Sequence, residues 1–340
     1  MKGCLLLFGA ILACAISGEE AGSGPFTITI EEDAGVMRCA EGVVVSLPFA
    51  EGALMEPHVK ITDAAGHPVE AQFEVLAQWG DGSIRWLLTR FFIDVLPAAR
   101  VVLTVTPGQS SAAEGPALAK AEGDIVTVRT GALCARVGGD ARDSFHVADA
   151  GGEPLLEEQP RLAVYTGDGQ VHRAGLPDTV ELEVNGPLYA SVFVAGPMKP
   201  AQGDQIFRYE TRLHFWRGKA EILAEHTLVT VGGPPVTVVD GIVVHLAADA
   251  VQEAILGGAT GQHEVALPEA GPVRLTQECA FWQECLPGWP SKYVVLEADF
   301  SYTLEAENRR IAQGERAPGW LWVGNQERSL GLAVRDFWEE

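Results

Sequence analysis

An all-β fold is predicted for this chain, with a small β-barrel or sandwich followed by a large antiparallel β-sandwich. Short β-branched runs cut by Gly, Pro and Asp follow one another, with turn signals about every 10 residues in the first third of the chain. No segment keeps helical periodicity for more than about two turns without a Gly, Pro or β-branched interruption. Such short strands are typical of antiparallel sheets that pack face to face.

The chain has 340 residues, more than the ~250 at which a single hydrophobic core usually splits into domains. The boundary is expected in a segment rich in Ser, Ala, Gly, Pro and Glu, residues 108–123, in which Leu118 is the large apolar side chain. We therefore expect an N-terminal β-domain over 25–107, a linker over 108–123 and a β-sandwich over 124–340.

The most informative stretch of the first domain is 78–88, where an Asp81-Gly82 turn joins two strands that each carry a tryptophan. An Asp-Gly pair between two such runs predicts a tight hairpin, because Gly adopts the positive φ that these turns need. We expect Trp79 and Trp86 in the core of the barrel. A platform for stacking a sugar ring is the alternative for both indoles.

Export is predicted from residues 1–15. Lys2 precedes an apolar run, and Ala13-Cys14-Ala15 provides a cleavage site of the A-x-A type after Ala15, as in a secretory signal peptide. Lipidation of Cys14 is the alternative. Past this segment no stretch approaches the ~20 consecutive apolar residues of a spanning helix. The mature protein is therefore expected to be secreted or periplasmic, with no membrane span.

The formal charge of −22, from 46 acidic and 24 basic side chains, argues against nucleic acids and anionic membranes as partners. An acidic polysaccharide stays open, because an Arg-lined site acts within a Debye length of ~8 Å, over which the average charge of the chain is screened. The G-x-S-x-G, H-E-x-x-H and Walker A motifs are absent. The sequence therefore excludes the enzyme classes that these motifs define.

Four cysteines lie past the signal segment, namely Cys39, Cys134, Cys279 and Cys285, and in an oxidising compartment they allow three pairings. Cys279 and Cys285 are close in sequence, so one expectation is a short loop closed by a disulfide, and the other is two free buried thiols. Their spacing is not that of a zinc site. No metal ligands and no cofactor are identified.

A dense polar constellation occupies residues 207–228 and predicts two strands around a turn. Period-two alternation places the polar side chains of the first strand on one face. These side chains are Arg208, Glu210, Arg212, His214 and Trp216. Guanidinium groups bind carboxylates, and an aromatic ring can pack against a pyranose face. The candidate substrate-binding residues for a sugar acid are therefore Arg208, Arg212, His214, Trp216 and His226.

The alternative for this hairpin is a solvated sheet face whose charges form cross-strand pairs, such as Arg212 with Glu225. His214 and His226 can supply a base or metal ligands if they lie close to each other across the hairpin. Incidental surface imidazoles are the other interpretation of this pair.

The last residues of the chain are strongly apolar, whereas natural termini are usually polar and frayed. We therefore expect the chain to stop within a longer protein. At least one of four large aromatic side chains should then be exposed, where a further domain would cover it. These four are Trp320, Trp322, Phe337 and Trp338.

The segment Trp79-Gly80-Asp81-Gly82-Ser83-Ile84-Arg85-Trp86-Leu87-Leu88 resembles the signature of the RIFT-barrel N-terminal domain of the exo-rhamnogalacturonan lyase and YetA-like family. Three further stretches are similar to the second domain of that family, a β-sandwich. They are Asn185-Gly186-Pro187-Leu188, the hairpin from Arg208-Tyr209 to His226-Thr227, and Ala317-Pro318-Gly319-Trp320 with Ala333-Val334-Arg335-Asp336-Phe337-Trp338. The resemblance covers most of the mature chain, in order, and these motifs specify architecture more than activity.

The resemblance implies β-elimination at a galacturonate in a polysaccharide or oligosaccharide. A cation such as calcium, or an Arg, neutralises the carboxylate, a base removes the C5 proton and an acid assists the leaving group. No residue is assigned to the base or the acid. In the family an α/α-toroid follows the sandwich and contributes to the active site, so the toroid is the expected intramolecular partner and this chain alone is expected to have little activity. A non-catalytic carbohydrate-binding or cell-envelope protein is the alternative.

Overall fold

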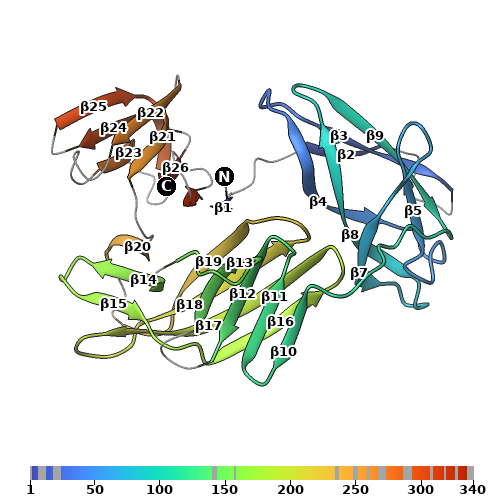
Figure 1. Ribbon diagram of the computed structural model, residues 1–340, viewed down its shortest axis with the longest axis horizontal. Coiled ribbons are helices and arrows are strands. Elements are labelled where there is room, and N and C mark those ends of the chain that lie inside the picture. Colours follow the sequence, from blue (N-terminus) through green and yellow to red (C-terminus); the bar gives the residue numbers. More distant parts are fainter. Residues whose placement is uncertain are drawn as a thin grey trace.

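A computed structural model shows the fold (Figure 1). It describes residues 2–6, 13–17, 24–139, 144–156, 158–233, 237–247, 252–258, 261–266, 273–285, 293–306, 309–317, 319–325 and 328–334, with the backbone alone at 2–6, 13–17, 258, 273, 277–301, 306 and 328. Every regular element in these ranges is a β-strand, and the strands form three units.

The N-terminal unit is built from a sheet in the order β2-β3-β9-β5-β6 and a second sheet in the order β4-β8-β7. Its strands are β2 (Ala13–Ser17), β3 (Phe26–Glu31), β4 (Arg38–Pro48), β5 (Val59–Thr62), β6 (Pro68–Val69), β7 (Ala71–Gln78), β8 (Ile84–Val95) and β9 (Arg100–Pro107). Both sheets turn one apolar face inward, and the two faces share one hydrophobic core that includes Ile28, Leu47, Leu87, Phe91 and Leu103.

The central unit packs the sheet β10-β11-β12-β13 against a sheet in the order β19-β18-β17-β15-β14-β20, with β16 also paired to β17. Its strands are β10 (Ala119–Glu122), β11 (Ile125–Arg129), β12 (Leu133–Gly138), β13 (Phe145–Asp149), β14 (Glu158–Thr166), β15 (Val171–Ala174), β16 (Thr179–Asn185), β17 (Tyr189–Pro200), β18 (Phe207–Trp216), β19 (Ile222–Thr230) and β20 (Val239–Ala247). Side chains of both sheets fill one core, so this unit is a β-sandwich.

The C-terminal unit contains the sheets β1-β27-β26-β21-β22 and β23-β24-β25. Its strands are β1 (Lys2–Leu6), β21 (Glu253–Gly258), β22 (Gly261–Ala266), β23 (Val273–Cys285), β24 (Tyr293–Ala306), β25 (Arg309–Gly314), β26 (Trp320–Gly324) and β27 (Arg328–Ala333). A small core of its own includes Ala254, Leu256, Val265 and Leu304. The sequence analysis did not separate this unit from the sandwich.

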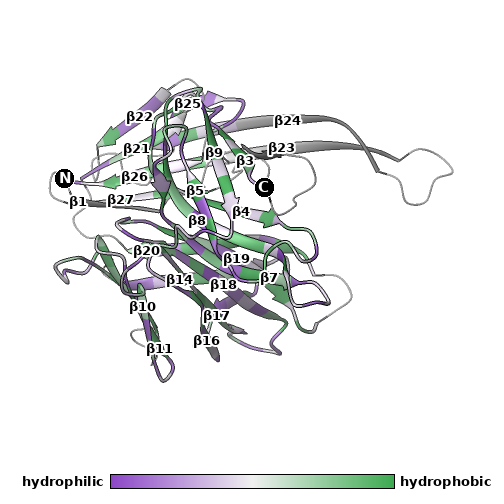
Figure 2. Ribbon diagram, turned by 90° about the vertical axis from the view of Figure 1, so that its right-hand side faces the viewer, coloured by the Kyte–Doolittle hydropathy of each residue, from purple (hydrophilic) through white to green (hydrophobic). Residues whose placement is uncertain are grey.

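The all-β prediction is confirmed, and Figure 2 shows apolar and polar residues interspersed along the strands. In the part of the chain that the structure describes, no helix has the length and apolar character needed to cross a bilayer. The segment predicted as a signal peptide contains β1 and the start of β2, and export stays a prediction. The segment predicted as a linker, 108–123, ends in β10, and its Leu118 lies in the core of the sandwich.

The predicted hairpin around Asp81 and Gly82 is present between β7 and β8. Ser83 is fully buried, donates its hydroxyl to Asp81 at 2.6 Å and accepts the N–H of Gly52 at 2.9 Å. The N–H of Ile84 also bonds the carbonyl of Leu54 at 2.7 Å. The Asp-Gly-Ser segment therefore fixes the turn to the loop after β4, and the orientation of β8 follows from it.

The cysteine expectations can be compared with the strands. Cys39 and Cys134 are free thiols. Cys279 and Cys285 lie six residues apart on the same strand, β23, which separates their Cα atoms by about 20 Å. A disulfide needs a Cα separation below about 7 Å, so the expected short loop closed by this pair is wrong.

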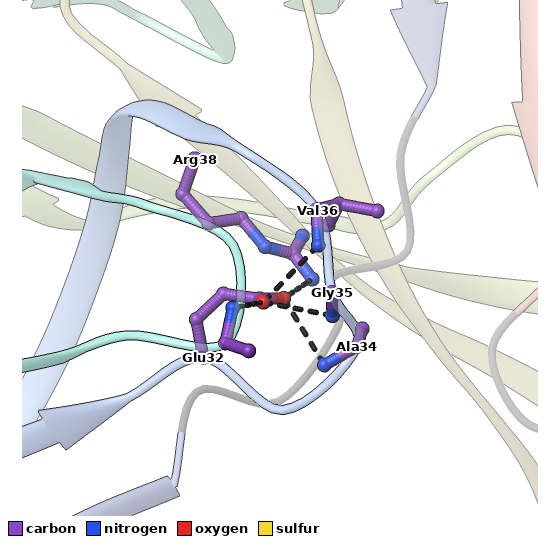
Figure 3. A network of polar contacts seen from close by, with 6 residues as sticks. Glu32, Ala34, Gly35, Val36 and Arg38 are labelled. Atoms are coloured by element: carbon purple, nitrogen blue, oxygen red, sulfur yellow. Dashed lines mark hydrogen bonds and ion pairs between the residues drawn. The ribbon is translucent and has the colours of Figure 1, made fainter.

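One buried carboxylate organises the loop between β3 and β4 (Figure 3). Glu32 is buried and accepts the N–H groups of residues 34–36 at 2.8 to 3.2 Å and the N–H of Ala98 at 3.0 Å. Arg38 adds an ion pair at 3.3 Å. The N–H of Ala98, followed by the other backbone donors and Arg38, holds the pKa of Glu32 below its ordinary value of 4.5.

We predict that Glu32→Gln lowers the urea midpoint of unfolding, because the amide removes the charge and turns an NH2 group toward backbone donors. The charged carboxylate stabilises the fold above its ordinary pKa of 4.5, and this stabilisation is lost as the pH falls through the lower pKa of the folded state. The difference between wild type and variant should thus be largest at neutral pH and shrink on acidification. Glu31→Gln, at an exposed ion pair with Arg100, is the matched control, and an equal loss in both variants would contradict the prediction.

Candidate functional site

The polar face predicted for the hairpin 207–228 exists on β18. Phe207, Tyr209, Leu213 and Phe215 point into the core of the sandwich. The side chains at alternate positions, Arg208, Glu210, Arg212, His214 and Trp216, are half-buried or exposed on the outer face. The prediction that one face of this strand gathers these residues is confirmed, and their partners decide what each can do.

The two arginines form different ion pairs. Arg208 donates Nη1 and Nη2 to the two oxygens of Asp178, both at 2.7 Å, so its whole fork is occupied. Arg212 donates Nε to both oxygens of Glu183 at 3.1 Å and lies 4.9 Å from the ring centroid of Phe193. Within the described part of the chain, its Nη edge carries no further partner. Arg212 is thus the arginine whose two Nη groups remain available to bind a second carboxylate.

The expected cross-strand pair of Arg212 with Glu225 does not form, although the two residues are opposite each other in the β18–β19 register. Glu183 on β16 takes the guanidinium instead. Glu225 lies beside His214, with 3.3 Å between its Oε2 and Nε2 of the imidazole. The alternative interpretation of this hairpin, a solvated sheet face whose charges form ion pairs, is supported. The partners in these pairs differ from those expected.

His214 belongs to a buried polar chain that reaches the strand β17. Its Nδ1 is hydrogen-bonded to the hydroxyl of Tyr189, and its Nε2 lacks hydrogen-bond geometry toward Glu225 despite the short distance. Burial lowers the pKa of His214 and raises the pKa of Tyr189. Both groups are therefore neutral at pH 7, and the phenol and the imidazole share a hydrogen bond.

His226 lies elsewhere. It is opposite Thr211 in the register, on the face of the sheet away from Arg212 and His214. Its Nδ1 is 2.9 Å from the Thr211 hydroxyl, and its side chain is exposed. Strand alternation therefore separates His214 from His226, and the closeness that a shared base or metal-binding role requires is not met. Within the described residues, no group of three or more His, Cys, Asp and Glu side chains is placed to hold a metal ion.

Trp216 and the Tyr189–His214 pair lie where the N-terminal unit meets the sandwich. Phe92 of β8 packs on Trp216 at 5.3 Å between ring centroids. Arg90, two residues earlier on the same face of β8, stacks on the Tyr189 ring at 4.4 Å and donates to Glu74 at 2.8 Å. We call this contact region the joint, and define it by Gly42, Gln72, Arg90, Phe92, Gly186, Tyr189 and Trp216.

Two glycines allow the N-terminal unit and the sandwich to approach each other closely at the joint. An ideal Cβ on Gly42 of the N-terminal unit would lie 2.6 Å from the Trp216 indole. A Cβ on Gly186 of the sandwich would lie 2.3 Å from the side-chain amide of Gln72. Each unit thus presents bare backbone to a flat side chain of the other. Sequence reasoning missed Gln72, Arg90 and Tyr189, and the glycine in Asn185-Gly186-Pro187-Leu188 was the available signal for them.

Trp79 and Trp86 are not in the core of the N-terminal unit. Trp79 lies at the rim, where its Nε1 donates to the carbonyl of Phe49 at 2.9 Å and Arg85 stacks on its ring at 4.7 Å. Trp86 lies on the outer face of β8 and is 38% exposed. The prediction that both indoles fill the barrel core is wrong. Trp320 and Trp322 are half-buried, while Phe337 and Trp338 fall outside the described residues, so the prediction of an exposed aromatic among the four stays a prediction.

Comparison with known proteins identifies the first unit. Residues 32–91 match the family model of the PcRGLX-like N-terminal RIFT barrel domain, and the predicted RIFT barrel is thereby confirmed. No curated protein matches the chain.

Two solved structures are similar to most of the chain. One is a protein in glycosyl hydrolase family 38 from Enterococcus faecalis, with a TM-score of 0.47 and 11% identity over 89% of this chain and 39% of its own. The other is an alpha-mannosidase from Enterococcus faecalis V583, with a TM-score of 0.49 and 9% identity over 88% of this chain and 37% of its own. This chain spans less than half the length of either protein, and a likeness of this size does not define its function.

We predict that Gly42→Ala destabilises the protein by about 1 to 3 kcal/mol, the usual cost of inserting a methyl group into a closed contact. The new Cβ would force Trp216 away from the joint, and the linker before β10 should become easier to cleave. Urea unfolding followed by tryptophan fluorescence, together with limited proteolysis, measures both effects.

Gly80→Ala is the matched control, because nothing lies within 4 Å of a Cβ at that position and its φ is not in the left-handed region. Equal stability of wild type and Gly42→Ala would show that the two units are not held together by this contact.

Proposed function

We propose that this chain belongs to an exported polysaccharide-processing protein, and that this protein is a lyase of the rhamnogalacturonan type that acts by β-elimination. The observation that carries the proposal is the match of residues 32–91 to the PcRGLX-like N-terminal RIFT barrel domain. The order of a RIFT barrel and a β-sandwich agrees with the resemblance seen along the rest of the sequence.

The polar face of β18 supplies one part of this chemistry. A galacturonate must have its carboxylate neutralised before its C5 proton becomes acidic enough to remove. Arg212 is suited to this task, because its side chain is 47% exposed and its Nη edge is open among the described residues. Arg208 is less suited, because Asp178 occupies both of its Nη groups.

The base and the acid stay unassigned. Tyr189 and His214 are neutral and hydrogen-bonded to each other, but Tyr189 is buried under Arg90 in the joint. A general base must come within hydrogen-bond reach of the proton that it removes. The pair therefore positions the face of β18 and does not touch the substrate in the arrangement described. A calcium ion that bridges the substrate carboxylate is compatible with the proposal.

The alternative is a non-catalytic carbohydrate-binding protein, and the ion pairs on β18 favour it. Each arginine of this face already has a carboxylate partner, as is usual for a face whose charges serve the fold. A binding protein needs no base, and no residue of this face is assigned to that role.

The test combines binding and product formation. Calorimetric titration with rhamnogalacturonan oligosaccharides measures binding, and ultraviolet absorbance of the unsaturated product measures β-elimination. We expect Arg212→Ala to weaken binding by about tenfold, as for the loss of one charge-assisted carboxylate contact. Arg100→Ala removes another exposed, ion-paired arginine and should leave binding unchanged.

Each outcome separates the two functions. Unsaturated product from the purified protein supports the lyase. Binding that depends on Arg212 without any product, in this chain and in any longer form of the protein, supports the binding module. Absence of both binding and product would overturn the proposal.

A further inference from the structure

The strand register shows which side chains lie next to one another on the outer face of the sheet β4-β8-β7. We call this arrangement of rows the grid. Trp86 pairs with Pro48 and Ala77, and Leu88 pairs with Ser46 and Glu74. One step further, Arg90 pairs with Val44 and Gln72. Strand alternation places all of these side chains on the same side of the sheet.

The joint covers one end of this grid and leaves the other end open. Arg90, Gln72 and Phe92 contact Tyr189 and Trp216 of the sandwich. At the open end Trp86 is 38% exposed, and Val44, which pairs with Arg90 at the edge of the joint, is 49% exposed. The open face is therefore continuous with the contact between the two units.

Trp86 differs from the other tryptophan of its hairpin. The indole of Trp79 has its Nε1 bonded to Phe49 and its ring covered by Arg85. In the described part of the chain, Trp86 has neither a hydrogen bond nor a ring partner, although the Asp81–Ser83 turn next to it is tightly bonded. The fold thus holds this indole on a rigid strand without using its outer face.

We propose that the open end of this grid, Trp86 with Leu88, Ser46 and Glu74, binds one pyranose ring of a glycan by stacking on the indole. The inference rests on the proposed function, since it names a contact between the protein and the same class of polymer. Trp86 and Leu88 supply an apolar platform, and the Ser46 hydroxyl and the Glu74 carboxylate next to Leu88 supply hydrogen-bonding groups for sugar hydroxyls.

The size of the patch favours a sugar over a protein partner. A stable protein interface buries about 1,200 to 2,000 Å² in total, whereas the exposed apolar part of this grid is one indole with one valine and an adjoining half-buried leucine. A pyranose ring covers a single indole. The Glu74 carboxylate is neutralised by Arg90 at 2.8 Å, so the platform does not repel either a neutral or an acidic glycan strongly.

The outer face of β18 in the sandwich can bind the same glycan. Arg212 lies four residues before Trp216 on β18, and Trp86 lies six residues before Phe92 on β8. At ~3.3 Å per residue, the two side chains stand about 13 and 20 Å from the joint along their strands. An oligosaccharide of several rings can therefore contact both outer faces.

The experiment is calorimetric titration of the full chain with rhamnogalacturonan oligosaccharides of increasing length. We expect Trp86→Ala to raise Kd by about tenfold, which corresponds to ~1.4 kcal/mol. Trp86→Phe, which keeps an aromatic ring, should retain most of the affinity. Met55→Ala, at a residue that is 58% exposed elsewhere on the same unit, is the control and should bind as wild type.

A cooperative urea transition of Trp86→Ala serves as the check on folding, and its midpoint is compared with that of Trp86→Phe. Wild-type affinity in a folded Trp86→Ala variant would overturn the inference, and so would failure of every oligosaccharide to bind the wild type. The proposed lyase activity is judged separately from product absorbance. Trp86-dependent binding without product, in this chain and in any longer form of the protein, leaves the inference standing and rejects the lyase, and product with Trp86-independent binding does the reverse.

Discussion

The side-chain amide of Gln72 is the interaction on which the placement of the first two units depends. Its Oε1 accepts the N–H groups of Leu188 and Tyr189 at 3.1 and 3.0 Å, and its Nε2 donates to the carbonyl of Tyr189 at 3.1 Å. A primary amide in this position replaces one peptide group of a neighbouring strand. The backbone entering β17 would otherwise leave these groups without partners inside a contact, at a cost of about 1 to 3 kcal/mol each.

Several features of the sequence follow from this amide. Gly186 must lack a Cβ, because the amide carbon of Gln72 takes that volume. Asn185 turns the other way and bonds both the N–H and the carbonyl of Ala119 at 3.0 and 2.9 Å, which ties β10 to the same loop. The Asn185-Gly186-Pro187-Leu188 motif is thus explained by its contact with the N-terminal unit at the joint. The aromatic stack of Phe92, Trp216 and Tyr189 then closes over it.

Short β-branched runs between turn residues were sufficient to predict the all-β fold. Period-two alternation was sufficient to predict the polar face of β18, because Phe207, Leu213 and Phe215 clearly mark its inner side. The same rule failed at Trp86. On β8 both faces are apolar, with Leu87 and Phe91 inside and Trp86 and Leu88 outside, so hydrophobicity alone did not fix which side is the core. Two register shifts in the pairing of β7 with β8 add to this ambiguity.

The partners of the candidate site were not predictable for a different reason. Gln72 and Tyr189 are 117 residues apart, and a contact between two separately folded sheets leaves no periodic trace in either of them. The pairing of Arg212 with Glu183 instead of Glu225 depends on β16, which lies beside β17 with a bulge between Leu182 and Val184. A one-residue shift of this kind changes which carboxylate reaches the face, and only the folded register shows it.

The pairing of charges on the two outer faces bears on the kind of ligand that they can accept. The chain carries a net charge of −22, yet Glu74 is matched by Arg90, and Glu183 by Arg212. Carboxylates neutralised in this way contribute little to the potential a few ångströms away, and the remaining acidic side chains are screened beyond ~8 Å. An approaching uronate therefore encounters local dipoles, and it can pair with the open Nη edge of Arg212 while Glu183 stays bound to Nε. A purely apolar face of the same shape would bind the sugar ring and leave its carboxylate without a partner, which is why the ion-paired arginines suit an acidic glycan even though they also serve the fold.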